Sequence, residues 1–151
     1  MKIGIIGKGY VGKATRILEC EEICTLVYDI DPEKCSPDGL QMKDLVGCTF
    51  VFVCVPTPMN KDGSCNTSIV SSVISDLIEC GYPSERIVVR STVPVGFCYG
   101  HRVSFMPEFL TEANWEEDFK NASKRIIGID RAEFDLRQKL IEDFGLLFFS
   151  G

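Results

Sequence analysis

The sequence lacks the patterns that mark nucleic-acid-binding and membrane-spanning proteins. Its formal net charge is −6 over 151 residues, it holds no run of Lys or Arg, and His101 is its single histidine. A stripe of basic side chains that could follow a phosphate backbone is therefore missing. No stretch reaches the roughly 18 apolar residues of a membrane span, and the first residues do not form a signal peptide. We expect a cytoplasmic protein with no nucleic-acid or membrane partner.

The cysteines lack the spacing of a metal site or a disulfide framework. There is no C-x-x-C pair among the eight, which are Cys20, Cys24, Cys35, Cys48, Cys54, Cys65, Cys80 and Cys98. Zinc sites need such pairs or nearby histidines, and disulfides belong to secreted proteins. We therefore expect no metal and interpret the cysteines as free thiols that pack as small apolar residues.

What the sequence does contain is a short apolar strand that leads into the spacing G-x-G-x-x-G at Gly7, Gly9 and Gly12. This spacing predicts a dinucleotide-binding turn. Gly7 would allow the tight strand-to-helix turn, Gly9 would let a pyrophosphate approach the backbone, and Gly12 would let the helix pack closely on the strand. The phosphates would then lie at the N-terminus of that helix.

An acidic residue follows at the distance that this turn requires. Cys24–Tyr28 reads as a strand, and Asp29 comes directly after it, about 20 residues beyond the glycines. A carboxylate there can accept both ribose hydroxyls of an adenosine and would repel a 2′-phosphate, which favours NAD over NADP. The alternative is that Asp29 or Asp31 only opens the turn at Asp31-Pro32.

The rest of the chain alternates between strand and helix patterns, which predicts one dinucleotide-binding domain over residues 1–151 and no second domain in this chain. The fold class is α/β, a Rossmann-like, open and mostly parallel sheet with helices on both faces. The expected helices are 11–20, 67–80 and 130–144. The further strands are expected at 49–55, 86–90, 102–106, 125–129 and 146–149.

One crossover looks too short for a helix. From Thr92 to His101 there are only ten residues before the next expected strand, and a parallel crossover usually needs a dozen or more. We expect this helix to be shortened or missing, so that the crossover is a bare loop or the next strand pairs differently.

Two glutamates, Glu108 and Glu112, stand four residues apart after that strand. If the segment is helical, both carboxylates share one face. They could then serve acid–base chemistry or simply face water.

Four segments resemble the NAD-binding domain of the UDP-glucose/GDP-mannose dehydrogenase family, in the same order and over nearly the whole chain. They are Gly7-Lys-Gly-Tyr-Val-Gly12, Val55-Pro-Thr-Pro58, Ser91-Thr-Val-Pro-Val-Gly96 and Pro107-Glu-Phe-Leu-Thr-Glu112, with Asp118-Phe119 continuing the last. The first motif is shared by many dehydrogenases, whereas the other three together are specific.

The resemblance implies two successive NAD-dependent oxidations that turn the C6 alcohol of a UDP- or GDP-linked sugar into a carboxylate through an enzyme-bound thioester. It implies that Glu108 helps water hydrolyse the thioester, that Glu112 lies beside the cofactor and the catalytic water, and that Thr92 lies near the nicotinamide. Phe109 and Leu110 would contact the sugar nucleotide. The implied cofactor-binding residues are Gly7, Gly9, Tyr10, Val11, Gly12, Asp29, Val55, Pro56 and Thr57.

The chain also departs from the family pattern. The family's thiol nucleophile lies in a Gly-rich segment of a later domain, and none of the cysteines here has that context, so Cys98 is interpreted as a structural or incidental thiol. We therefore expect the chain to be catalytically incomplete alone, and a homo-oligomer is possible. One alternative is a free-standing, non-catalytic NAD-binding or regulatory module. Another is a related short-chain hydroxyacid dehydrogenase domain, which the three specific motifs disfavour.

Overall fold

The computed structural model describes residues 1–129 and 134–149, and their strands form one parallel sheet in the order β2-β1-β3-β4-β5. The strands are β1 (Lys2–Ile6), β2 (Cys24–Tyr28), β3 (Phe50–Val53), β4 (Ile87–Val89) and β5 (Ser104–Phe105). β3 and β4 are buried along their whole length, as expected of continuous apolar runs covered on both faces. The strand order changes direction between β1 and β3, and open α/β sheets bind ligands at the carboxyl ends of such strands.

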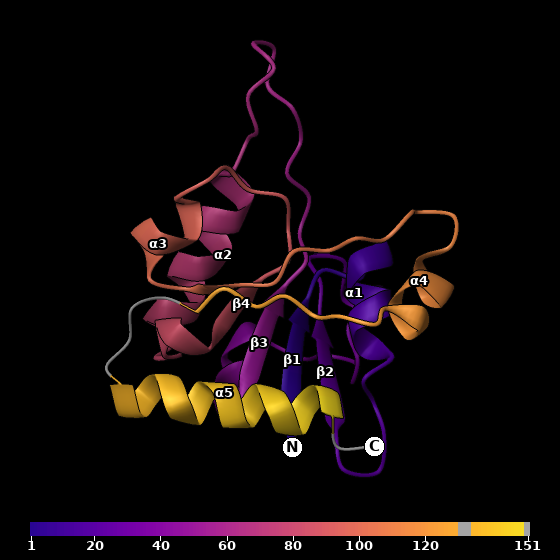
Figure 1. Cartoon of the computed structure of the whole chain (residues 1–151). Helices are drawn as coiled ribbons and strands as arrows, with labels where there is room; N and C mark the ends of the chain where they lie inside the picture. The colour runs from indigo at the N-terminus through magenta and orange to yellow at the C-terminus, as the bar shows by residue number, and fades with distance from the viewer. Residues whose placement is uncertain (130–133, 150–151) are drawn as a thin grey trace.

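Helices cover both faces of this sheet, as the sequence predicted (Figure 1). On one face the core joins the sheet to α2 (Ser68–Glu79) and α3 (Phe97–His101). On the other face it joins the sheet to α1 (Tyr10–Arg16) and α5 (Phe134–Phe149), and α4 (Trp115–Asn121) contacts α1. Three short 3₁₀ helices complete the described elements: η1 (Pro32–Lys34), η2 (Met42–Gly47) and η3 (Ser84–Arg86).

The helix predicted at 67–80 is confirmed as α2. Val70, Ile74 and Leu77 lie on its buried face, one helical turn apart. The Asn66 side chain accepts a hydrogen bond from the Ser68 amide at 3.0 Å, and Gly81 ends the helix with a φ of +89°. Before α2 the chain extends away from the sheet as a narrow hairpin, magenta in Figure 1, whose arms meet at the bridge between Met59 and Cys65.

The connection between β4 and β5 holds a short helix, which confirms that this crossover helix is shortened, whereas the expected choice between a bare loop and a different strand pairing was wrong. The strands are shorter than predicted, which leaves fourteen residues, 90–103, for the crossover. The five-residue α3 fits there because Gly96 before it and Arg102 after it both take left-handed backbone angles, with φ of +87° and +56°. β5 then pairs parallel to β4.

The two strands expected near the end of the chain were also wrong. Residues 146–149 belong to α5, whose Leu140, Phe144 and Leu147 are buried against the sheet. Periodicity cannot separate a short apolar run in a strand from one in a helix, and here the spacing of 140, 144 and 147 continues a helical face. Of residues 125–129, only Gly128 forms a bridge, antiparallel to Phe105. The predicted helix start at Asp130 lies outside the described residues.

Within the described ranges, no helix is both long enough and apolar enough to cross a membrane.

Candidate functional site

The glycine turn follows β1 at the carboxyl edge of the sheet, and its three glycines meet different surroundings. Gly7 has a φ of +95°, and a Cβ there would lie 2.6 Å from the Cys54 carbonyl oxygen. A Cβ on Gly12 would lie 1.9 Å from the Gly7 carbonyl oxygen, whereas a Cβ on Gly9 would meet nothing within 4 Å. Gly7 and Gly12 are therefore required by the fold itself, while Gly9 leaves an open backbone surface that a ligand can approach.

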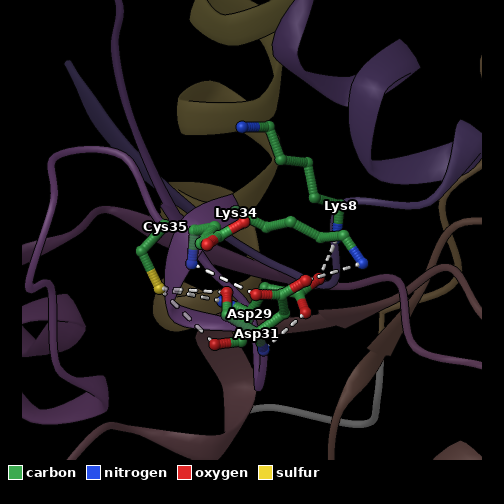
Figure 2. Close-up of polar contacts among 6 residues, drawn as sticks. Lys8, Asp29, Asp31, Lys34 and Cys35 are labelled. Carbon is green, nitrogen blue, oxygen red and sulfur yellow. Dashed lines mark hydrogen bonds and ion pairs between the residues drawn. The ribbon is translucent and has the colours of Figure 1, made fainter.

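Asp29 at the end of β2 reaches this turn. Its Oδ2 accepts a hydrogen bond from the Lys8 amide at 2.7 Å, and its Oδ1 accepts one from the Asp31 amide at 3.0 Å (Figure 2). Both aspartates also take part in the turn that the alternative reading described, because Asp29 accepts from the Asp31 amide and Asp31 accepts from the Glu33 amide, where η1 begins. The carboxylate of Asp29 thus fixes the glycine turn against the end of β2.

Two further residues beside Asp29 were not predicted from the sequence to belong to the site. The Cys35 thiol, which is buried, lies 3.5 Å from the Asp29 amide and 3.4 Å from the Asp29 carbonyl oxygen, and so holds the backbone of Asp29 from both sides. The Lys34 ammonium forms an ion pair of 3.2 Å with Asp31 (Figure 2). The i, i+3 spacing of Asp31 and Lys34 was a visible signal, whereas nothing in the sequence indicated the contact of Cys35.

The loops after β3 and β4 meet beside the glycine turn. A Cβ on Gly7 would lie 3.4 Å from the Val55 side chain, and the Ser91 hydroxyl donates to the Val55 carbonyl oxygen at 2.7 Å. Thr57 is half-buried and Pro56 is exposed. Thr92 follows as an exposed residue, and its carbonyl oxygen accepts from the Cys65 thiol of the hairpin at 3.4 Å. The structure therefore brings the loops of β1, β3 and β4 to one edge.

The two glutamates come together for a reason other than the one proposed from their spacing. Residues 107–111 are not helical, so a shared helical face does not exist. Both carboxylates nevertheless act on the Tyr10 hydroxyl at the start of α1: burial raises the pKa of Tyr10, and the charges of Glu108 and Glu112 raise it further. Tyr10 thus connects the carboxylates to the glycine turn.

The remaining predicted residues of this segment differ in exposure. The Leu110 amide donates to Glu108 at 3.1 Å, and Leu110 is half-buried, while Phe109 is 72% exposed. Among the described residues, Thr92 and the glutamates are not joined by a hydrogen bond.

The thiols of Cys54 and Cys98 are poor nucleophiles. Burial raises the pKa of Cys54, which lies under the glycine turn, to about 11, and burial raises the pKa of Cys98 on α3 to about 11. Both stay protonated near neutral pH, and the thiolate is the reactive form. Among the described residues, no group of three or more His, Cys, Asp or Glu side chains is placed to hold a metal ion.

These features define a dinucleotide-binding domain of the Rossmann type, with its ligand edge at the carboxyl ends of β1 and β3. The sequence pattern described as the UDP-glucose/GDP-mannose dehydrogenase family, NAD binding domain, matches residues 38–143. The chain belongs to this family of NAD-dependent oxidoreductases and is its NAD-binding domain, so its cofactor is NAD.

Curated relatives and solved structures agree with the assignment. The chain is similar to a putative UDP-glucose 6-dehydrogenase of Bacillus subtilis, with 32% identity over 88% of this chain and 40% of the relative, and to the UDP-glucose 6-dehydrogenase of Rickettsia bellii, with 25% identity over 88% and 40%. Its fold matches a GDP-mannose dehydrogenase from Pseudomonas aeruginosa, with a TM-score of 0.74, 20% identity, and coverage of 95% of this chain and 44% of that chain. The chain thus spans about 40% of the length of these curated relatives.

The residues present fit NAD on the geometry of this chain alone. The family pattern begins at residue 38, after the glycine turn and Asp29. The open backbone at Gly9 and the carboxylate of Asp29 nevertheless provide the two features that a dinucleotide needs, close approach for a pyrophosphate and an acceptor for ribose hydroxyls.

Proposed function

We propose that this chain is the cofactor-binding part of a nucleotide-sugar 6-dehydrogenase, which oxidises the C6 alcohol of a UDP- or GDP-linked sugar to a carboxylate. The observation that carries the proposal is that Glu108 and Glu112 lie near enough to Tyr10, beside the glycine turn, for their charges to raise its pKa. Binding of NAD alone requires no such pair of carboxylates. A free-standing regulatory module therefore accounts for less of the site.

The residues have distinct proposed roles. Asp29 would accept the adenosine ribose hydroxyls and Thr92 would lie near the nicotinamide, where NAD supplies the hydride acceptor. Glu108 would help water attack the thioester, with Glu112 beside the cofactor and this water. Phe109 and Leu110 would contact the sugar nucleotide. The glycine turn, as Gly7, Gly9, Tyr10, Val11 and Gly12, would border the pyrophosphate, and Val55, Pro56 and Thr57 would border the rest of the dinucleotide.

Tyr10 could hold the carboxylates in place without neutralising their negative charge. The phenol is protonated at neutral pH, and its raised pKa favours the protonated form further, so it can donate a hydrogen bond toward Glu108. A protonated donor orients a carboxylate and leaves it able to accept a proton from water. Tyr10 would then be a positioning residue for the general base.

Calorimetric titration with NAD and NADP tests the cofactor part of the proposal. A 2′-phosphate beside the Asp29 carboxylate should weaken NADP binding about tenfold or more relative to NAD. Asp29→Asn should weaken NAD binding and reduce the preference for NAD over NADP. Asp76→Asn on the exposed side of α2 should leave the affinities for NAD and NADP unchanged. Equal affinities of the unchanged chain for NAD and NADP would show that Asp29 does not have this role.

Formation of NADH from a panel of UDP- and GDP-linked sugars tests the catalytic part. We expect the chain to bind NAD but not to turn over alone, because none of its cysteines has the Gly-rich context of the family's nucleophile. Turnover by the purified chain would refute its catalytic incompleteness. The cytoplasmic location and a homo-oligomer stay predictions.

A further inference from the structure

A cavity of about 390 Å³ lies between the Pro107–Leu110 segment, the end of α4 and the residue that follows β4. Its wall holds three cationic side chains, Arg90, Lys124 and Arg125, and one carboxylate, Asp118. The Asp118 carboxylate is already engaged, because it accepts from the Thr111 amide at 2.8 Å and from the Thr111 hydroxyl at 2.7 Å. The cavity therefore has an excess of positive charge.

Arg90 is the unusual member of this wall. It is only 3% exposed, and one of its Nη atoms donates to the Thr15 hydroxyl at 2.6 Å. Its Nε has no hydrogen-bond acceptor among the residues that the structure describes. A buried cation normally has an anionic partner, since its desolvation is costly otherwise.

Arg125 brings a second positive charge to the same place. Its guanidinium lies 4.1 Å from the centre of the Phe119 ring, and that of Arg90 lies 5.5 Å from the same centre. Burial lowers the pKa of Arg125, and the charge of Arg90 lowers it further. In the described part of the chain, neither arginine has a carboxylate within ion-pair distance.

Arg86 shows how the same fold satisfies a half-buried arginine elsewhere. It too lies over an aromatic ring, at 5.6 Å from the centre of Phe50, and donates to a backbone carbonyl, that of Thr49. Unlike Arg90 and Arg125, it also pairs with a carboxylate, Asp143, at 3.0 Å. At the cavity the charge of Glu108 acts on Arg90 without forming an ion pair, and among the described residues no carboxylate pairs with Arg125. A bound anion would complete this arrangement.

We propose that this cavity binds an oxyanion, a carboxylate or phosphate group of a small molecule, between Arg90 and Arg125. Guanidinium groups bind both anions through paired, charge-assisted hydrogen bonds. Phe109 and Ile126 line the same cavity and are 72% and 57% exposed, so the wall also offers apolar surface to an organic body that carries the anion. The cavity is separate from the NAD assignment, but it shares Phe109 and Leu110 with the proposed sugar-nucleotide contacts and in this respect rests on the proposed function.

Titration of the full chain with inorganic phosphate, glucuronate and neutral glucose tests the proposal, with the Nε–H signals of Arg90 and Arg125 followed by NMR. Phosphate or glucuronate should shift both signals to saturation, and glucose should shift neither. Arg125→Gln should weaken binding about tenfold or more, the effect of losing a charge-assisted hydrogen bond. Lys61→Gln, which removes one charge at the exposed hairpin, should leave binding unchanged.

The two anions show which anionic group the ligand carries. Saturation by glucuronate alone indicates a carboxylate, and saturation by phosphate alone indicates a phosphate. The absence of saturable shifts with both anions, or equal weakening by Arg125→Gln and Lys61→Gln, would overturn the proposal. Lys124→Gln offers a second test if Arg125→Gln fails to fold. The Gly9 amide reports NAD separately, so failure of the NAD site and failure of this cavity are distinguishable.

Discussion

Replacing Gly12 by alanine tests how closely α1 packs on the end of β1. The added Cβ would lie 1.9 Å from the Gly7 carbonyl oxygen, whereas ordinary contacts begin at 3.4 Å. The two backbone segments must therefore separate by about 1.5 Å, and no rotation of a side chain can relieve the contact. Gly7 itself cannot move freely, because it lies against the Cys54 carbonyl.

The magnitude follows from two opposing effects. Forcing extra atoms into a packed region costs about 1–3 kcal/mol, and the upper end applies to a clash with backbone. Alanine in place of glycine within a helix returns about 1 kcal/mol. The net loss of about 2 kcal/mol should lower Tm by roughly 4–8 °C for a chain of this size.

Thermal and denaturant unfolding followed by circular dichroism measures this loss, with Gly9→Ala as the matched control. Gly9 has a φ of −72°, and a Cβ there meets nothing within 4 Å, so alanine should leave stability unchanged or slightly higher. It should weaken NAD binding, because the Cβ occupies the open surface. If Gly12→Ala unfolds like the unchanged chain, or if Gly9→Ala loses as much stability, the packing argument is refuted.

Three further perturbations test other parts of the structure. Burial raises the pKa of Cys54 from near 9 to about 11, so its contribution to stability is complete below about pH 9, and about 2–3 kcal/mol is lost as pH rises through 11. Cys54→Ala should reduce this loss in denaturant titrations at about pH 8 and about pH 10.5, and the raised pKa values of Cys48 and Cys98 leave the remainder. Asp143→Asn removes the carboxylate that pairs with Arg86 at 3.0 Å, and should lower the free energy of unfolding by about 2 kcal/mol in urea titrations. Glu108→Gln should lower the pKa of Tyr10 toward its ordinary value of 10.0, as measured by NMR titration of ring-labelled tyrosine.

Each of these has a control on the exposed surface. Cys20→Ala should leave the alkaline loss of stability as it is, and an unchanged loss in Cys54→Ala would contradict the role of that thiol. Asp76→Asn should not alter urea unfolding, and a similarly neutral Asp143→Asn would mean that its ion pair contributes nothing. Glu117→Gln should not change the titration of Tyr10. If Glu108→Gln also leaves the pKa of Tyr10 unchanged, the two side chains do not interact.

Local patterns predicted much of the fold and the cofactor end of the site. The strand Cys24–Tyr28 was predicted with its observed bounds, and α2 was predicted from the spacing of its apolar residues. The predictions were wrong where tertiary contacts with another element determine the secondary structure of a segment. Residues 146–149 are apolar in either a strand or a helix, and only the contact of α5 with the sheet, including the stacking of Phe144 on Phe50 at 4.1 Å, selects the helix.

The sequence by itself determined the glycine turn, the acidic residue that follows β2 and the four family segments. These features depend on the backbone conformation and spacing of residues that are close together in the sequence. The tertiary structure alone decided which side chains meet across the sheet edge. The charges of both glutamates act on Tyr10 although their segment is not helical, and Arg90 and Arg125 share one ring with no ion pair to a carboxylate among the described residues. Such contacts join residues far apart in the sequence, and their energies depend on burial, which no local pattern records.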